Sequence, residues 1–235
     1  MNRKTQPVSE GFDFVRWLRF TSIAYILGVG FAASLPVLVY FETGLPQDFR
    51  KTLLFFGLFA VGGLFKGILV GYFQWLVLQR VFRRLNFVHW LRATCGAATI
   101  GWMIVFLPLA AVLNPMPNEA FPNAVSKISV DYFLLRAAFA GAIYGAIFGG
   151  CQWFVLRKLV KKNAWLWILA NIIGWAVGFG MIYMTATFPD KYTPKVIVCI
   201  LCSFGGELAG AFVNLATGFS IERMEPLAET DFKLK

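Results

Sequence analysis

Charged residues are scarce in this sequence: they make up 14% of 235 residues, whereas a typical soluble domain carries about 25%. Histidine occurs once, at His89. The four cysteines all fall in apolar segments, where a thiol acts as a small hydrophobic group, so no disulfide framework is expected. Cys199 and Cys202 form a CxxC pair without a second pair or a nearby histidine, and no metal site is predicted.

The sequence also lacks the usual signatures of catalysis. It contains no HExxH motif, no GxSxG motif, and no glycine loop ending in Lys-Ser or Lys-Thr that would hold a phosphate. No catalytic residue is assigned, and the chain is predicted not to be an enzyme.

Apolar residues dominate instead. They form 58% of the chain, the mean hydropathy is +0.66, and they occur in runs of about 20 residues, the length that crosses a bilayer core as a helix. Six spans are predicted, at 20–41, 52–78, 91–113, 130–156, 164–185 and 196–219. The predicted fold is all-α, a polytopic transmembrane helical bundle. Its domains are a basic cytoplasmic or interfacial segment at 1–19, the six-helix domain at 20–220, and a polar cytoplasmic tail at 221–235.

Basic residues alternate between the loops rather than forming one stripe, so nucleic acid is not an expected partner despite the formal net charge of +10. Fifteen of them fall in the two termini and the second and fourth loops, against five in the other loops. The positive-inside rule therefore places both termini in the cytoplasm. The tryptophans beside the basic loops are expected at headgroup level; they are Trp17, Trp90, Trp165 and Trp167.

An internal duplication relates the second and third spans to the fourth and fifth, in units of about 52–112 and 130–185. The first copy has Gly63, Gly67, Gly71, Gln74, Trp75 and Leu78, and the second has Gly141, Gly145, Gly149, Gln152, Trp153 and Leu156, each offset by 78 residues. A weaker third echo in the last span has Cys202, Gly206, Gly210 and Asn214. Glycines four residues apart share a helix face and let helices approach closely, so these glycines are predicted as packing positions.

The repeated GxxxGxxQWxVL pattern, from Gly67 and again from Gly145, resembles the repeats of small polytopic bacterial membrane proteins, largely of cyanobacterial type. The resemblance covers spans two to five. It implies the bundle architecture and a bacterial inner or thylakoid membrane, and it supplies no catalytic or binding residues.

Two charges fall near mid-membrane, where an unpaired charge is costly. Lys66 in the second span and Glu207 in the last span have opposite signs and similar depth, so they are candidates for a buried ion pair. Gln74, Gln152 and Asn214 complete the candidate polar site. A bundle-fixing role and a substrate or proton site both remain open for these residues.

Two functions compete. The first is a non-enzymatic accessory or scaffold subunit that packs against lipids, other membrane proteins or pigments, in a bioenergetic or photosynthetic complex as the resemblance implies. Its cofactor is unknown, with lipid or pigment as candidates. The second is the small-solute-binding membrane component of a transporter similar to vitamin importers, in which Lys66 and Glu207 hold the solute.

Overall fold

The computed structural model describes residues 12–44, 46, 48–113 and 130–227, and within them the chain is almost entirely helical. The helices are α1 (Phe14–Thr43), α2 (Phe49–Val81), α3 (Phe87–Leu113), α5 (Val130–Leu156), α6 (Leu166–Thr187) and α7 (Lys195–Glu222). Two short strands, β1 (Val160–Lys162) and β2 (Glu225–Pro226), pair antiparallel. The prediction of an all-α polytopic bundle is confirmed.

Local sequence signals set several of the helix ends. Asp13 caps α1 by accepting a hydrogen bond from the Arg16 amide at 2.9 Å, and Asp48 caps α2 in the same way through the Lys51 amide. Gly44 ends α1 with a φ of 70°, a left-handed backbone that glycine adopts without steric cost. These caps satisfy backbone groups that a helix end would leave unpaired.

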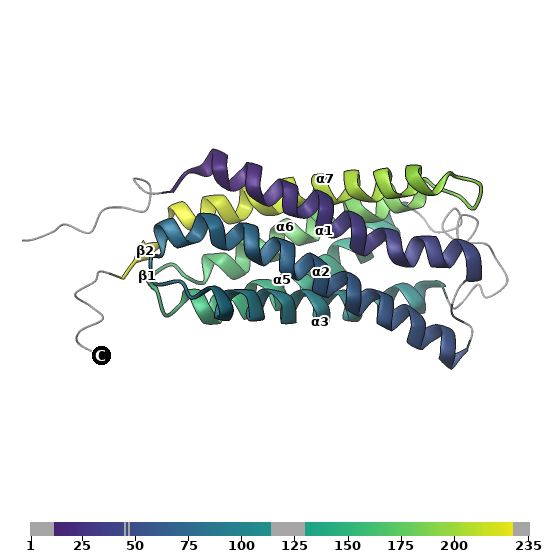
Figure 1. The fold of residues 1–235 in the computed structure, drawn as a ribbon, viewed down its shortest axis with the longest axis horizontal. Helices are drawn as coiled ribbons and strands as arrows, with labels where there is room; N and C mark the ends of the chain where they lie inside the picture. Colours follow the sequence, from purple (N-terminus) through teal and green to yellow (C-terminus); the bar gives the residue numbers. More distant parts are fainter. Residues whose placement is uncertain (1–11, 45, 47, 114–129, 228–235) are drawn as a thin grey trace, which may run out of the picture.

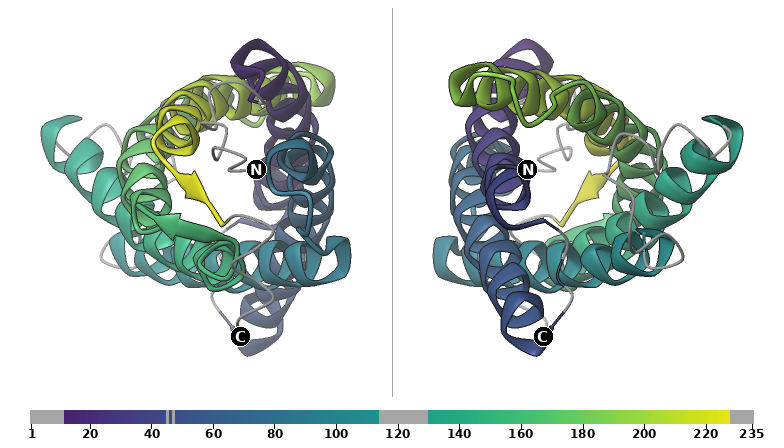
Figure 2. Two further views of the ribbon diagram at one scale, coloured as in Figure 1. Left: turned by 90° about the vertical axis from the view of Figure 1, so that its left-hand side faces the viewer. Right: turned by 90° about the vertical axis from the view of Figure 1, so that its right-hand side faces the viewer.

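The six helices form a ring in chain order (Figures 1 and 2). Each helix packs on the next one along the chain, and α7 closes the ring by packing on α1. The interface between α3 and α5 is the least extensive of the six. Because the ring is closed, side chains on its inner faces meet at a common axis, and this axis is where the buried polar residues gather.

Five of the helices are long and apolar enough to cross a membrane: α1, α2, α5, α6 and α7. Their outward side chains include many exposed large apolar residues, such as Phe139 and Phe154. An apolar outer surface with polar groups inside is the arrangement expected of a bundle surrounded by lipid. The helix α3 has 27 residues and lies in the same ring, but it is not among these five. That α3 is a sixth span stays a prediction.

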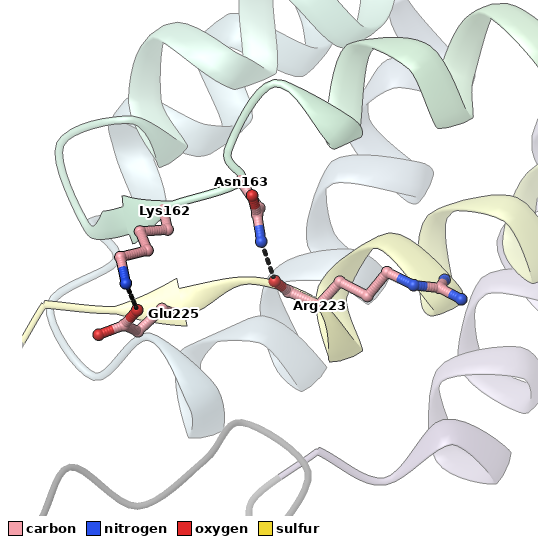
Figure 3. A network of polar contacts seen from close by, with 4 residues as sticks. All are labelled: Lys162, Asn163, Arg223 and Glu225. Atoms are coloured by element: carbon pink, nitrogen blue, oxygen red, sulfur yellow. Dashed lines mark hydrogen bonds and ion pairs between the residues drawn. The ribbon is translucent and has the colours of Figure 1, made fainter.

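One end of the ring carries the start of α1, the α2–α3 and α5–α6 connections and the end of α7; we call it the basic end. At this end β2 pairs with β1 (Figures 1 and 2). Figure 3 shows the polar contacts of the strand pair: Lys162 Nζ lies 3.3 Å from Glu225 Oε2, and Asn163 donates a hydrogen bond to the Arg223 carbonyl. The chain after α7 is therefore attached to the α5–α6 connection.

The structure revises the predicted end segments. The first helix starts at Phe14, inside the segment 1–19 that was expected to lie at the interface. The predicted tail at 221–235 starts with the last turn of α7 and then β2, a strand that was not predicted. Residues 1–11 and 228–235 lie outside the described residues.

Candidate functional site

Rows of glycines lie at the contact surface of three helix pairs in the ring. Gly63, Gly67 and Gly71 of α2 face α3, Gly141, Gly145 and Gly149 of α5 face α6, and Gly206 and Gly210 of α7 face α1. A Cβ atom on Gly67 would lie 2.7 Å from Cys95 Cα, and one on Gly206 would lie 2.7 Å from the Tyr25 carbonyl oxygen. Real Cβ atoms essentially never come this close to another heavy atom, so a side chain here would force the backbones apart.

Lys66 lies inside the ring with none of its surface exposed. Its ammonium nitrogen, Nζ, donates a hydrogen bond to Tyr144 Oη at 2.6 Å. The same nitrogen lies 3.9 Å from the ring centroid of Trp175, 4.3 Å from that of Tyr144 and 4.6 Å from that of Trp102. We call Trp102, Tyr144, Phe148 and Trp175 the aromatic box. Each ring face attracts the cation, and in a desolvated setting one such contact is worth about 2 kcal/mol.

The expected pair of Lys66 with Glu207 is not formed. Among the described residues no carboxylate contacts Lys66, and Glu207 Oε2 is buried without a hydrogen-bond partner. The reason is the order of the ring, in which α1 lies between α2 and α7. Gly28 of α1 packs on Lys66, while Gly30 of the same helix packs on Ser203, one turn before Glu207. The similar depth of Lys66 and Glu207 in their spans therefore did not predict whether the two side chains are in contact.

A second polar cluster lies between the aromatic box and the basic end. Gln152 is its centre: its side-chain nitrogen donates to Gln74 Oε1 at 2.8 Å and to Thr94 Oγ1 at 2.9 Å, and its oxygen accepts from Trp167 Nε1 at 3.0 Å. We call Gln74, Thr94, Gln152, Asn171 and Asn214 the amide layer. All five side chains are fully or almost fully buried, so their polar atoms depend on partners inside the protein.

Several polar atoms in and beside the amide layer have no such partner. Asn214 leaves both Oδ1 and Nδ2 without a hydrogen bond, and Asn171 leaves Oδ1 without one. The Nε1 atoms of Trp90 and Trp175 and the hydroxyl oxygen of Tyr25 are also buried and unpaired. An unpaired buried donor or acceptor costs about 1–3 kcal/mol, so this concentration of them calls for a bound polar partner.

Three indole rings meet on the basic side of the amide layer, where Trp167 makes T-shaped contacts with both Trp17 and Trp90. Trp167 lies 6.1 Å from Trp17 and 6.0 Å from Trp90 between ring centroids, and all three are fully buried. These three side chains are packed inside the ring and not on its outer surface, and their expected position at headgroup level stays a prediction. Trp165, at 56% exposure, is the member of the expected group that faces outward.

The predicted repeat has a structural counterpart that sequence reasoning overlooked. Lys66 bonds to Tyr144 and Gln74 bonds to Gln152, and in each pair the two residues are 78 positions apart. If two units face each other across an axis along the membrane normal, equivalent positions meet at that axis. The offset applied to Lys66 would have pointed to Tyr144. Trp102 and Trp175 carried a repeat signal too, since each follows a glycine, Gly101 or Gly174, in the second helix of its unit. Phe148 had no comparable signal.

The described residues hold no group of three or more His, Cys, Asp or Glu side chains suited to a metal ion. All four cysteines are free thiols, including Cys199 and Cys202. Around the aromatic box and the amide layer, the polar groups are amides, indoles, hydroxyls and the amine of Lys66. Such groups can hold a ligand by hydrogen bonds and charge.

The ring of apolar helices around a polar interior defines a polytopic membrane protein. Comparisons of the chain with protein-family models, with curated proteins and with solved structures gave no match. The resemblance to small bacterial membrane proteins therefore stays a prediction.

Proposed function

We propose that the protein is a membrane-embedded binder of a small polar solute, of the kind that serves as the substrate-binding component of a transporter. The observation that carries this proposal is Asn214, which is fully buried with both polar atoms of its side chain unpaired. A purely structural amide in an apolar interior has its bonds made by the protein, as Gln152 does. Asn214 instead offers one donor and one acceptor.

The position of the site supports the same function. The amide layer receives side chains from α2, α3, α5, α6 and α7, and the buried indoles of Trp17, Trp90 and Trp167 lie on its basic side. Ligand sites in membrane proteins are commonly built from polar groups that face the interior of the bundle. A solute held here would be shielded from the lipid by every helix of the ring.

The accessory subunit is the competing proposal. It is supported by the outward phenylalanines, such as Phe139, Phe204 and Phe212, which offer a lateral packing surface for lipid, pigment or another subunit. A lipid-facing surface is apolar in either case, so this observation is weaker than the unpaired interior groups. Under both proposals the protein is not an enzyme and both termini are cytoplasmic, in a bacterial inner or thylakoid membrane.

A thermal-shift screen in mild detergent separates the two proposals. The wild type is screened against small organic acids, amides, alcohols, amines and vitamins, and each positive is repeated with Asn214→Leu. Solute binding predicts a saturable rise in melting temperature that the variant loses. The matched control is Gln79→Leu on α2, whose side chain lies outside the amide layer, and it should keep the shift. No saturable shift with any compound, together with co-purification of a stoichiometric membrane subunit, would overturn the proposal in favour of the accessory role.

A further inference from the structure

We infer that the solute is a small organic anion of the carboxylate class, with Lys66 supplying the compensating charge. This inference rests on the proposed function and names its substrate class. It comes from two independent features of the interior: a buried lysine amine without a carboxylate partner, and unpaired hydrogen-bond donors on neighbouring helices.

The lysine amine is that of Lys66, which is fully buried. Taking an ammonium group out of water into a bundle interior is costly, and proteins usually offset the cost with a carboxylate. Among the described residues no acidic side chain pairs with Lys66: Glu42 pairs with Lys195, Glu225 pairs with Lys162, and Glu207 lies on α7, which α1 separates from α2. Tyr144 and the aromatic rings stabilise the ammonium, but they bring no negative charge.

The unpaired donors follow a chain of ring contacts that starts at Lys66. Trp175, whose ring centroid is 3.9 Å from Lys66 Nζ, has an unpaired indole N–H. Tyr25 has an unpaired hydroxyl, and its ring centroid lies 5.5 Å from that of Trp175. Gly210 packs on Tyr25, and Asn214, one helical turn further along α7, adds an unpaired amide N–H. Three helices, α1, α6 and α7, thus direct free donors to one region.

A carboxylate can pair with more of these groups than other classes of ligand can. Its oxygens accept several hydrogen bonds at once, and bonds to a charged acceptor are about twice as strong as neutral ones. A cation would find no carboxylate in contact with Lys66 among the described residues, and a neutral amide would bring no negative charge to pair with a protonated Lys66 amine. The unpaired Oδ1 of Asn171, one turn from Trp175, is placed to accept from a hydroxyl on the ligand, which favours a hydroxycarboxylate.

Ligand titrations of the detergent-solubilised full chain test the inference, with tryptophan fluorescence and melting temperature as readouts. The probes are propionate and lactate, their neutral counterpart propionamide, the cation propylammonium, and sodium chloride as the inorganic reference. We expect saturable binding of the two carboxylates, with lactate tighter than propionate. Propionamide and propylammonium should bind at least about tenfold more weakly.

Three variants test whether Lys66, Trp175 and Tyr25 form the binding site. Lys66→Met removes the charge and should abolish carboxylate binding. Trp175→Phe and Tyr25→Phe each remove one donor but keep an aromatic ring, so they should weaken binding about tenfold even if Lys66→Met does not fold. Lys195→Met is the matched control, since it removes an exposed lysine at the other end of the helices and should leave affinity unchanged.

The outcomes separate this inference from the proposed function. Saturable, Asn214-dependent binding of propionamide with no preference for carboxylates would overturn the anion assignment and leave solute binding standing. Equal binding of chloride would overturn the carboxylate class. Carboxylate binding that Trp175→Phe and Tyr25→Phe leave unchanged would overturn the site. Absence of binding by every probe, and by every compound of the wider screen, would overturn both proposals.

Discussion

Replacing Gln152 with leucine should destabilise the bundle more than any other single change in the amide layer. Gln152 makes three buried side-chain hydrogen bonds, to Gln74, Thr94 and Trp167, and these join α5 to α2, α3 and α6. Interhelical hydrogen bonds in membrane proteins are worth about 0.6 kcal/mol on average and up to about 1.7 kcal/mol. Three of them give an expected loss of roughly 2–5 kcal/mol, because the partners left behind also remain buried without bonds.

A double-mutant cycle sharpens this prediction. Gln74 has one hydrogen bond, the one it accepts from Gln152, so Gln74→Leu should cost less, about 1 kcal/mol. Once Gln152 is leucine, the further change of Gln74 should cost almost nothing, because its bond is already lost. The double variant should therefore be more stable than the sum of the single losses by about 0.5–1.5 kcal/mol.

The assay is unfolding in mixed detergent micelles, followed by circular dichroism and tryptophan fluorescence. Gln79→Leu serves as the control, since it makes the same chemical change on α2 outside the amide layer and should alter stability by no more than about 0.5 kcal/mol. The reasoning is refuted if Gln152→Leu and Gln79→Leu unfold at the same detergent fraction, or if the Gln74 and Gln152 losses are strictly additive.

Three further predictions follow from the ring. Lys66→Met and Glu207→Leu should have additive effects on melting, within about 0.5 kcal/mol, because the two side chains do not meet; rescue of one change by the other would show that they do. Gly149→Leu should lower stability by about 1–3 kcal/mol, because a Cβ atom there would lie 2.8 Å from the Cβ atom of Asn171. Gly150 has open space around it, so Gly150→Leu should be nearly neutral. Equal melting temperatures of the two variants would exclude the packing role. A reporter fused after Lys162 should read cytoplasmic, and an external reading would invert the topology.

The sequence predicted the helices well because hydrophobic length and turn residues are local signals. The predicted fourth span, 130–156, coincides with α5, and the last span differs from α7 by only a few residues at each end. The glycine spacing also identified faces that contact other helices, since i and i+4 positions share a side of a helix whatever surrounds it.

The contents of the interior were harder to predict. Which side chain meets Lys66 depends on the order of helices around the ring, and this order is a property of tertiary packing. A charge at similar depth suggested Glu207, but the ring places α1 between the two helices and gives Lys66 aromatic partners instead. The inward packing of Trp17, Trp90 and Trp167 was not predicted for a similar reason: position along the span gives depth but not the direction in which a ring points.

Native mass spectrometry of the protein purified in mild detergent tests the central claim most directly, because it counts small molecules bound per chain. An interior solute site predicts that the wild type takes up one equivalent of the best ligand from the screen, that Asn214→Leu takes up none, and that Gln79→Leu behaves as the wild type. Equal uptake by the wild type and Asn214→Leu would contradict the claim that the amide layer holds the solute.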